Sequence, residues 1–292
     1  MIGPQRTTKA IADGLGPEAT NLIQALYLLQ DNKGEDADHD KKAEWKFRRF
    51  QWIAKNCCPD ATLLRKVAER RAALVPSPDG KVLKLKIVKD SSLTVGMSTS
   101  TLLENGMALL RPWGIPVIAG SSIKGTISSW LSEILIGVLN PTSKERVRIL
   151  HSSGLWELFG ESRKENGADV GFPGRVNFLD ALPLNMTLAV DVTTPHYQSW
   201  YQKLVAPLGC ENPIPVSFLC LQSGSTFQFA YVVEKGTALP DLTAYDTTLS
   251  GMDIVERQNP VLFIDQLIRS TAKWHGFGSQ TAAGYGRMEK VE

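Results

Sequence analysis

The stretch His275-Gly-Phe-Gly-Ser-Gln-Thr-Ala-Ala-Gly-Tyr-Gly-Arg287 carries the strongest fold signal of the chain. It holds two G-x-G pairs, formed by Gly276 and Gly278 and by Gly284 and Gly286. Glycine is the usual residue where the backbone takes a positive φ or approaches a ligand closely, and clustered backbone N–H groups bind anions. Lys273 and Arg287 flank the glycines. These features suit a loop that holds phosphate, but taken alone the stretch favours a glycine-rich hairpin turn over such a loop.

Neither common nucleotide-binding fingerprint fits the chain. A Rossmann loop needs a third glycine three residues after Gly278, where Thr281 stands, and it follows a strand and opens a helix. The segment nearest to a P-loop, Gly120-Ser-Ser-Ile-Lys-Gly-Thr126, has its lysine before the second glycine instead of after it. A mononucleotide or dinucleotide enzyme is therefore disfavoured.

The composition is that of an ordinary globular protein, with 292 residues, 43% hydrophobic and 21% charged. A net charge of +2 is too small for the whole surface to bind a polyanion, so a nucleic-acid site must be a local basic patch. We find no signal-peptide pattern in residues 1–20 and no apolar run of about 18 residues, and we expect a cytoplasmic protein with no membrane partner. Reduced thiols, no metal and no cofactor are expected, because zinc-site spacing is missing among Cys57, Cys58, Cys210 and Cys220.

We expect a helical N-terminal extension over residues 1–80 and a second domain over residues 81–292, because Pro76-Ser-Pro-Asp-Gly80 forms a clear turn between them. Apolar residues recur at helical spacing over 18–30, 41–55 and 61–74. The helices expected over 41–55 and 61–74 carry many basic residues. We interpret them as solvated faces, with a role facing a partner or RNA as the alternative.

Beyond residue 80 the apolar residues follow strand-like alternation in some segments and helical spacing in others. Lysines alternate with apolar residues over 81–89, which predicts a strand, and an apolar helical stripe follows Ser121 or Ser122, either of which would be the N-cap. We further expect a helix over 144–158, a loop over 161–175, a strand over 175–181, a hairpin of 216–221 with 226–233, a helix over 260–274 and a strand over 285–291. This order predicts an α+β fold with a ferredoxin-like β-α-β-β-α-β core, as in RNA-recognition (RRM-like) domains, and insertions at about 138–175 and 192–215.

Lys124 stands in the first turn of the helix expected after Ser121 and Ser122. A lysine there opposes the helix dipole. That cost makes sense if an anion sits at the helix N-terminus, where backbone N–H groups favour phosphate. An exposed lysine without a role remains the alternative on this observation alone.

Three stretches together resemble the RAMP superfamily of CRISPR-associated proteins: Ile-Ala-Gly-Ser-Ser-Ile-Lys-Gly at 118–125, Phe159-Gly160 with the strand at 176–181, and the loop at 276–286. Their order and spacing extend over residues 81–292. With Asp191-Val-Thr-Thr-Pro-His-Tyr197 added, the chain is most similar to the sixth-subunit family of the type III-B (Cmr) effector complexes. The helical start before the first strand also suits that family.

The resemblance implies a Cas7-like subunit with a ferredoxin-like fold. Such a subunit would bind guide CRISPR RNA toward its 3′ end, meet target RNA, and pack against other Cmr RAMP subunits in a hetero-oligomeric antiviral effector. This family is not credited with target cleavage, so we expect no enzyme activity. One departure concerns the helix: RAMP helices often carry a basic residue shortly after Lys-Gly, whereas residues 126–129 are Thr-Ile-Ser-Ser. That departure reduces the phosphate contacts expected along the helix.

The residues themselves favour binding over catalysis. Phosphate contacts position RNA without reading its sequence, and Phe277, Tyr285 or Trp113 would stack on bases, with burial in the core as the alternative. The expected RNA-binding residues are Ser121, Ser122, Lys124, His196, Tyr197, Lys273, His275, Gly276, Phe277, Gly278, Ser279, Gln280, Thr281, Gly284, Tyr285, Gly286 and Arg287.

A guide-RNA-processing endoribonuclease of the same superfamily is the alternative function. Metal-independent cleavage of RNA needs an acid–base pair, commonly with histidine, and His275 lies beside the loop. The helix expected over 121–137 contains no histidine, which favours binding. A third hypothesis is a scaffold whose glycine loop packs only against protein.

Overall fold

The computed structural model describes residues 21–27, 39–98, 105–137, 142–165, 168–195 and 215–291, together with Trp200 and Ala206. The chain divides into two compact units. The first unit comprises Met1–Asp60, Thr94–Pro116 and Met186–Gln222, and the second comprises Ala61–Leu93, Val117–Asn185 and Ser223–Glu292. Residues 1–80 thus contribute to both units, and the expected domain boundary at residue 80 stays a prediction.

A four-stranded antiparallel sheet forms the centre of the second unit, with strands in the order β10-β1-β9-β6. These strands are β1 (Gly80–Ile87), β6 (Val176–Asn185), β9 (Thr226–Val233) and β10 (Met288–Lys290). Leu83 of β1 lies opposite Phe229 of β9, and Phe178 of β6 lies opposite Tyr231 of β9. The long central strand β9 therefore holds together strands that are distant in the sequence.

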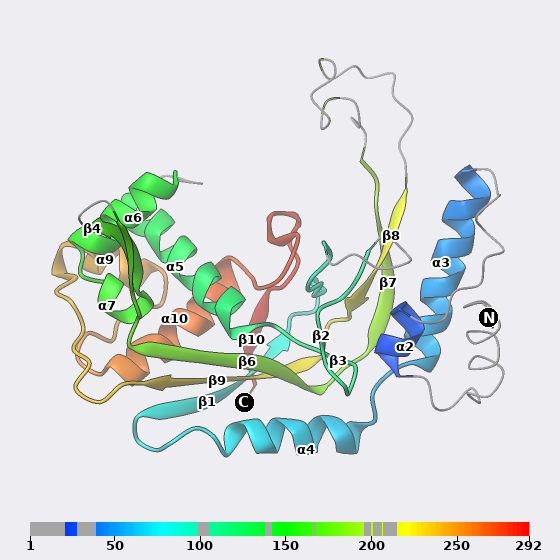
Figure 1. Ribbon diagram of the computed structural model, residues 1–292, viewed down its shortest axis with the longest axis horizontal. Coiled ribbons are helices and arrows are strands. Elements are labelled where there is room, and N and C mark those ends of the chain that lie inside the picture. The colour runs from blue at the N-terminus through cyan, green and yellow to red at the C-terminus, as the bar shows by residue number, and fades with distance from the viewer. Residues whose placement is uncertain are drawn as a thin grey trace. The chain divides into compact units, whose positions relative to one another are not determined.

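Helices cover both faces of this sheet (Figure 1). They are α5 (Gly120–Ile136) and α10 (Pro260–Trp274) on one face and α4 (Ala61–Ala72) on the other. Tyr231 Oη donates to Val261 O of α10 at 2.5 Å, and Gln228 Nε2 donates to Ala68 O of α4 at 2.7 Å. Odd and even residues of a strand point to opposite faces, so β9 is buried on both sides.

The result is a mixed α/β fold with antiparallel sheets, as expected for the α+β class. Along the chain, α5 lies between β1 and β6, and α10 lies between β9 and β10. The helices expected over 41–55, 61–74 and 260–274 are confirmed. α10 begins at Pro260 with Asn259 as its N-cap, whose side chain accepts the Val261 N–H at 2.9 Å.

The start of α5 differs from the expectation. Its N-cap residue is Ala119, which makes no side-chain cap bond, and Asp180 Oδ1 of β6 accepts the Gly120 N–H at 2.9 Å instead. Gly120 is required at this close approach, because a Cβ there would collide with Phe178 O. The prediction that Ser121 or Ser122 caps the helix is wrong, since the cap comes from a strand about sixty residues away in the chain.

Three further expectations differ from the structure. The loop expected over 161–175 is largely a hairpin of β4 (Glu161–Glu165) and β5 (Ala168–Phe172), which pair with each other. The hairpin expected between 216–221 and 226–233 does not form, because β1 and β6 occupy the two edges of β9. The helix expected over 144–158 is two helices, α6 (Ser143–Ser152) and α7 (Trp156–Phe159), with Gly154 at φ 75° between them.

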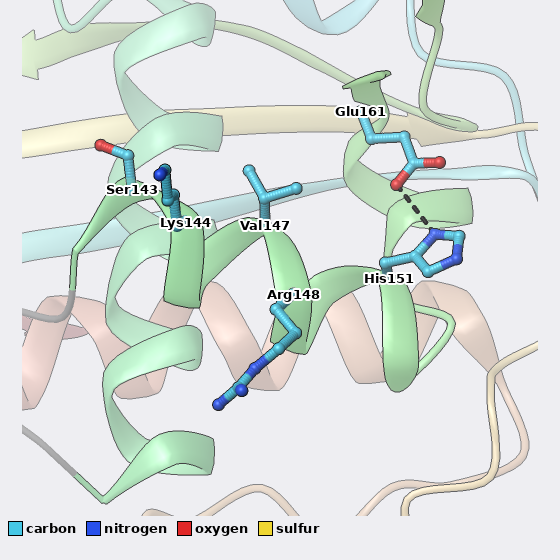
Figure 2. Close-up of a pocket in the computed structure, with 6 residues that line it drawn as sticks. All are labelled: Ser143, Lys144, Val147, Arg148, His151 and Glu161. Atoms are coloured by element: carbon cyan, nitrogen blue, oxygen red, sulfur yellow. Dashed lines mark hydrogen bonds and ion pairs between the residues drawn. The ribbon is translucent and has the colours of Figure 1, made fainter. Parts of the chain in front are cut away.

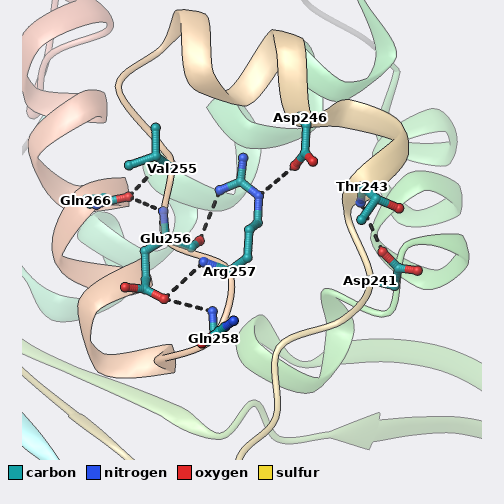
Figure 3. Close-up of polar contacts among 8 residues, drawn as sticks. All are labelled: Asp241, Thr243, Asp246, Val255, Glu256, Arg257, Gln258 and Gln266. Atoms are coloured by element: carbon teal, nitrogen blue, oxygen red, sulfur yellow. Dashed lines mark hydrogen bonds and ion pairs between the residues drawn. The ribbon is translucent and has the colours of Figure 1, made fainter.

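The loop ahead of α10 is fixed by side chains that bind backbone groups (Figure 3). The Glu256 carboxylate accepts the N–H groups of Arg257 at 3.0 Å and Gln258 at 2.8 Å. Gln266 Oε1 of α10 accepts the Glu256 N–H at 2.8 Å. Arg257 Nε donates to Asp246 Oδ1 at 2.9 Å, which ties the loop to α9 (Asp246–Gly251) and to the adjoining 3₁₀ turn η2 (Thr243–Tyr245). This bonding orients α10, whose other end carries the glycine loop.

Two small sheets and two helices lie in the described residues of the first unit. They are β7 (Leu188–Thr193) paired with β8 (Val216–Leu221), β2 (Leu109–Leu110) paired with β3 (Ile115–Pro116), α2 (Leu22–Tyr27) and α3 (His39–Asn56). α3 packs against β7 and β8 and buries Phe50 and Ile53. Thr94 Oγ1, also buried, donates to Leu219 O at 3.3 Å.

In the part of the chain that the structure describes, no helix combines the length and apolarity that a bilayer crossing requires. The same residues contain no group of three or more His, Cys, Asp or Glu side chains that could hold a metal ion. Cys57, Cys58 and Cys220 are free thiols, and burial raises the pKa of Cys57 to about 11.

Candidate nucleic-acid interface

The glycine loop, residues 275–287, runs from the end of α10 to the start of β10. The Gly276 N–H donates to Thr271 O at 2.8 Å, which closes the last turn of α10. The Phe277 N–H donates to Gly286 O at 3.0 Å, so the two G-x-G pairs lie beside each other at the base of the loop. A 3₁₀ turn, η3 (Thr281–Ala283), forms its centre. The fold therefore brings the predicted glycines together.

Gly286 is the most constrained residue of the glycine loop. Its φ is 76°, and a Cβ at this position would collide with Phe277 O. Its N–H donates to Ser92 O at 2.7 Å. Only glycine combines this positive φ with so close a backbone approach.

Ser91 anchors the loop and was missed in the sequence. Its Oγ donates to Gly284 O at 2.8 Å and accepts the Arg287 N–H at 3.2 Å. Ser91 is buried and follows β1 closely, so one hydroxyl joins the end of that strand to the last residues of the loop. A Ser-Ser pair directly after the predicted strand was the available signal, but its partners lie almost two hundred residues away.

The two cations beside the glycine loop are bound within the protein. Lys273 Nζ lies 2.6 Å from Asp253 Oδ2 and 4.7 Å from the Trp274 ring centroid. Arg287 Nη1 donates to Lys273 O at 3.1 Å and so holds the end of α10. Both side chains thus have intramolecular roles, and the positive charge that the loop offers to a ligand is smaller than the sequence predicts.

The aromatic residues of the glycine loop differ in exposure. The Phe277 ring is fully buried, with its centroid 5.2 Å from that of Phe229 in β9. It is a core residue and is not available to stack on a base, which corrects the expectation for its side chain. Tyr285 is partly exposed, and Trp113, in the first unit, is 38% exposed.

His275 is partly buried at the end of α10. Burial is the main cause that lowers the pKa of its imidazole below the ordinary value; the Glu133 carboxylate of α5 raises that pKa, and the Arg287 guanidinium lowers it. The imidazole is therefore neutral at pH 7. A phosphate contact by His275 would be a hydrogen bond and not an ion pair.

The lowered pKa of His275 predicts a pH dependence of stability. The unfolded chain takes up a proton at this residue below about pH 6.5, whereas the folded protein takes it up only at a lower pH, so acidification favours unfolding. We expect the free energy of unfolding to fall between pH 7 and 5.5, at no more than about 1.4 kcal/mol per pH unit for this one proton. Urea unfolding of the native chain and of His275→Asn, compared across this range, isolates the effect; identical pH profiles would contradict it.

The first turn of α5 forms a second group of candidate residues. Ser121 and Ser122 are exposed and Lys124 is partly exposed. Across the described residues, these three side chains form no hydrogen bond or ion pair, and none joins them to the glycine loop. The first backbone N–H groups of a helix have no intrahelical acceptor, and of these the Gly120 N–H donates to Asp180 Oδ1. The side chains of Ser121, Ser122 and Lys124 remain for an anion at the start of α5, as a group separate from the loop.

The remaining predicted residues have varied positions. In the glycine loop Gly278 is exposed at φ 95°, Gln280 takes the left-handed conformation at φ 58°, and Ser279 and Thr281 are partly exposed. His196 and Tyr197 lie outside the described residues.

Comparison with known proteins gives the family. A family model described as the RAMP superfamily matches residues 86–289. The CRISPR system Cmr subunit Cmr6 of Pyrococcus furiosus is 24% identical over 255 residues, which cover 70% of this chain and 66% of that protein, just under two thirds of its length.

Two solved structures match the chain, and the first of them is similar in fold. One is a chain from the cryo-EM structure of the type III-B Cmr-beta bound to cognate target RNA, with a TM-score of 0.57, 18% identity, and coverage of 98% of this chain and 87% of that one. The other is the crystal structure of Cmr6 from Pyrococcus furiosus, with a TM-score of 0.42, 23% identity, and coverage of 73% and 98%. The family match covers most of the chain, including α5, β6, β9, α10 and the glycine loop, and the chain therefore belongs to the RAMP superfamily.

Proposed function

We propose that this protein is a non-catalytic RNA-binding subunit of a type III-B CRISPR effector. It holds the guide RNA backbone toward its 3′ end, meets target RNA, and contacts other Cmr RAMP subunits in the cytoplasm. The similarity to Cmr6 and to a chain of an RNA-bound Cmr-beta structure supports this assignment.

The proposal includes a ferredoxin-like core within a RAMP domain over residues 81–292. The sequence order β1, α5, β6, β9, α10, β10 and the sheet order β10-β1-β9-β6 support it. In this arrangement α5 and α10 lie on the same face of the sheet, and the candidate residues lie at the start of one helix and the end of the other.

The observation that carries the proposal is the start of α5, where the side chains of Ser121, Ser122 and Lys124 are accessible and have no partner among the described residues. Helix N-termini bind phosphate through backbone N–H groups, and a lysine close to that end of the helix adds the positive charge that a phosphodiester chain requires. Exposed Gly278 would let a second stretch of backbone approach the RNA.

Lys124→Ala tests this role. We expect the affinity of the purified chain, or of its assembled complex, for guide RNA to fall about three- to tenfold, because one phosphate contact is lost. The slope of log K against log salt should also shrink by about 0.7. Fluorescence anisotropy over a salt series measures both quantities.

Lys235→Ala is the matched control, since Lys235 is 87% exposed in its side chain and lies 3.8 Å from Asp79. Its affinity and salt slope should equal those of the native chain. Unchanged values for Lys124→Ala as well would contradict the proposed contact.

The alternative function, endoribonuclease activity, is supported by the neutral imidazole of His275, which is the form that a general base requires. Incubation of the protein with repeat RNA in the absence of metal distinguishes the two functions. The binding role predicts intact RNA. Specific cleavage that His275→Ala abolishes would instead assign the alternative.

A further inference from the structure

A hollow of about 500 Å³ lies beside α6 (Figure 2). Its lining residues are Ser143, Lys144, Val147, Arg148, His151 and Glu161. All but Glu161 come from α6, and Glu161 begins β4. Positions i, i+3, i+4 and i+7 share one face of a helix, so the spacing of the α6 residues forms a continuous stripe.

This stripe combines an apolar centre with positive charge. Val147 is 48% exposed, and no residue of α6 is buried. Lys144 and Arg148 are exposed on either side of it and form no ion pair with any described residue. Two like charges four residues apart destabilise a helix slightly. An anionic partner would remove that cost.

The other charges of α6 are already engaged within the protein. Glu145 forms a capping box with Thr142, and Arg146 lies 3.5 Å from Glu133 of α5. His151 Nδ1 lies 3.1 Å from Glu161 Oε2, and the Glu161 side chain is only 5% exposed. Lys144 and Arg148 are therefore the charges that this surface offers to a partner.

We propose that this surface, residues 143–151 with Glu161, docks a protein segment in which an apolar side chain is flanked by carboxylates. The apolar side chain covers Val147, and the carboxylates pair with Lys144 and Arg148. A phosphodiester chain fits less well, because it carries no apolar side chain to cover the apolar floor at Val147. Interface centres are apolar and rims are charged in this way, and complementary rim charges speed association and select partners.

Photo-crosslinking in cells tests the proposal with the full chain in its own host. Val147 is replaced by the photo-reactive residue p-benzoylphenylalanine, the cells are irradiated, and the crosslinked peptides are sequenced by mass spectrometry. We expect a protein crosslink at a segment with two or more Asp or Glu residues beside an apolar one. RNA adducts, crosslinks confined to neutral or basic segments, or no crosslink would overturn the proposal.

Charge variants in the same experiment test the role of the two cations. We expect Lys144→Glu with Arg148→Glu to lower the crosslink yield about tenfold, and Lys144→Ala with Arg148→Ala to lower it about threefold, because rim charges control association. Arg65→Glu with Lys66→Glu on the exposed face of α4 is the matched control and should leave the yield unchanged. Equal yields for all variants would contradict the pairing. RNA affinity should stay unchanged in all three, which separates this surface from the proposed RNA contacts.

Discussion

Gly286→Ala is expected to lose about 3 kcal/mol or more of folding free energy. An alanine would take a left-handed conformation at φ 76° that costs about 1–2 kcal/mol, and its Cβ would collide with Phe277 O, which adds about 1–3 kcal/mol of strain. The substitution would also disturb the Gly286 N–H bond to Ser92 O. Urea unfolding measures the loss.

Gly284→Ala separates the two causes. Its φ is 92°, but no atom lies within 4 Å of a Cβ built there. We therefore expect only the conformational cost of about 1–2 kcal/mol. Equal stability of the two variants would contradict the predicted collision between a Cβ at position 286 and Phe277 O.

Phe277→Ala should destabilise the protein by about 3–5 kcal/mol, because it leaves a cavity in a packed core. The ring is fully buried against Phe229 between the glycine loop and the central sheet. Phe277→Leu keeps most of that volume and should cost less than about 1.5 kcal/mol. Thermal or urea unfolding of both variants gives these values.

Phe277→Leu also tests what the aromatic ring does. A core residue predicts unchanged RNA affinity for this variant. Loss of a stacked base would instead weaken binding by about 1–3 kcal/mol. A clear loss of RNA affinity in a Phe277→Leu protein of near-native stability would restore the stacking role.

Much of the fold could be predicted from local patterns. The helices α3, α4 and α10 follow from apolar periodicity, and Pro260 marks the start of α10. The hairpin of β4 and β5 was missed, because β4, Glu-Ser-Arg-Lys-Glu, has no apolar residue and so lacks the alternation that marks a strand. The pairing of β9 was also missed. The turn at 222–225 has the sequence of a hairpin turn, and the local sequence does not show that β1 and β6, not β8, pair with β9.

The candidate site was predictable in its backbone but not in its side chains. Glycines mark positions where the backbone takes a positive φ or approaches another segment closely, so the sequence predicted the loop. Side-chain roles depend on residues that folding brings near. Asp253 forms an ion pair with Lys273, the Phe229 ring packs against Phe277, and Asp180 caps α5. Such partners carry no local signal, because a strand or a distant loop supplies them.

Crosslinking of guide RNA within the assembled complex tests the central claim most directly. Guide RNA that contains 4-thiouridine is irradiated in the complex, and the adducts on this chain are located by mass spectrometry. The RNA-binding role predicts adducts at the start of α5, residues 120–126, and in the glycine loop, residues 275–287. Adducts elsewhere on this chain with none in either segment would contradict it.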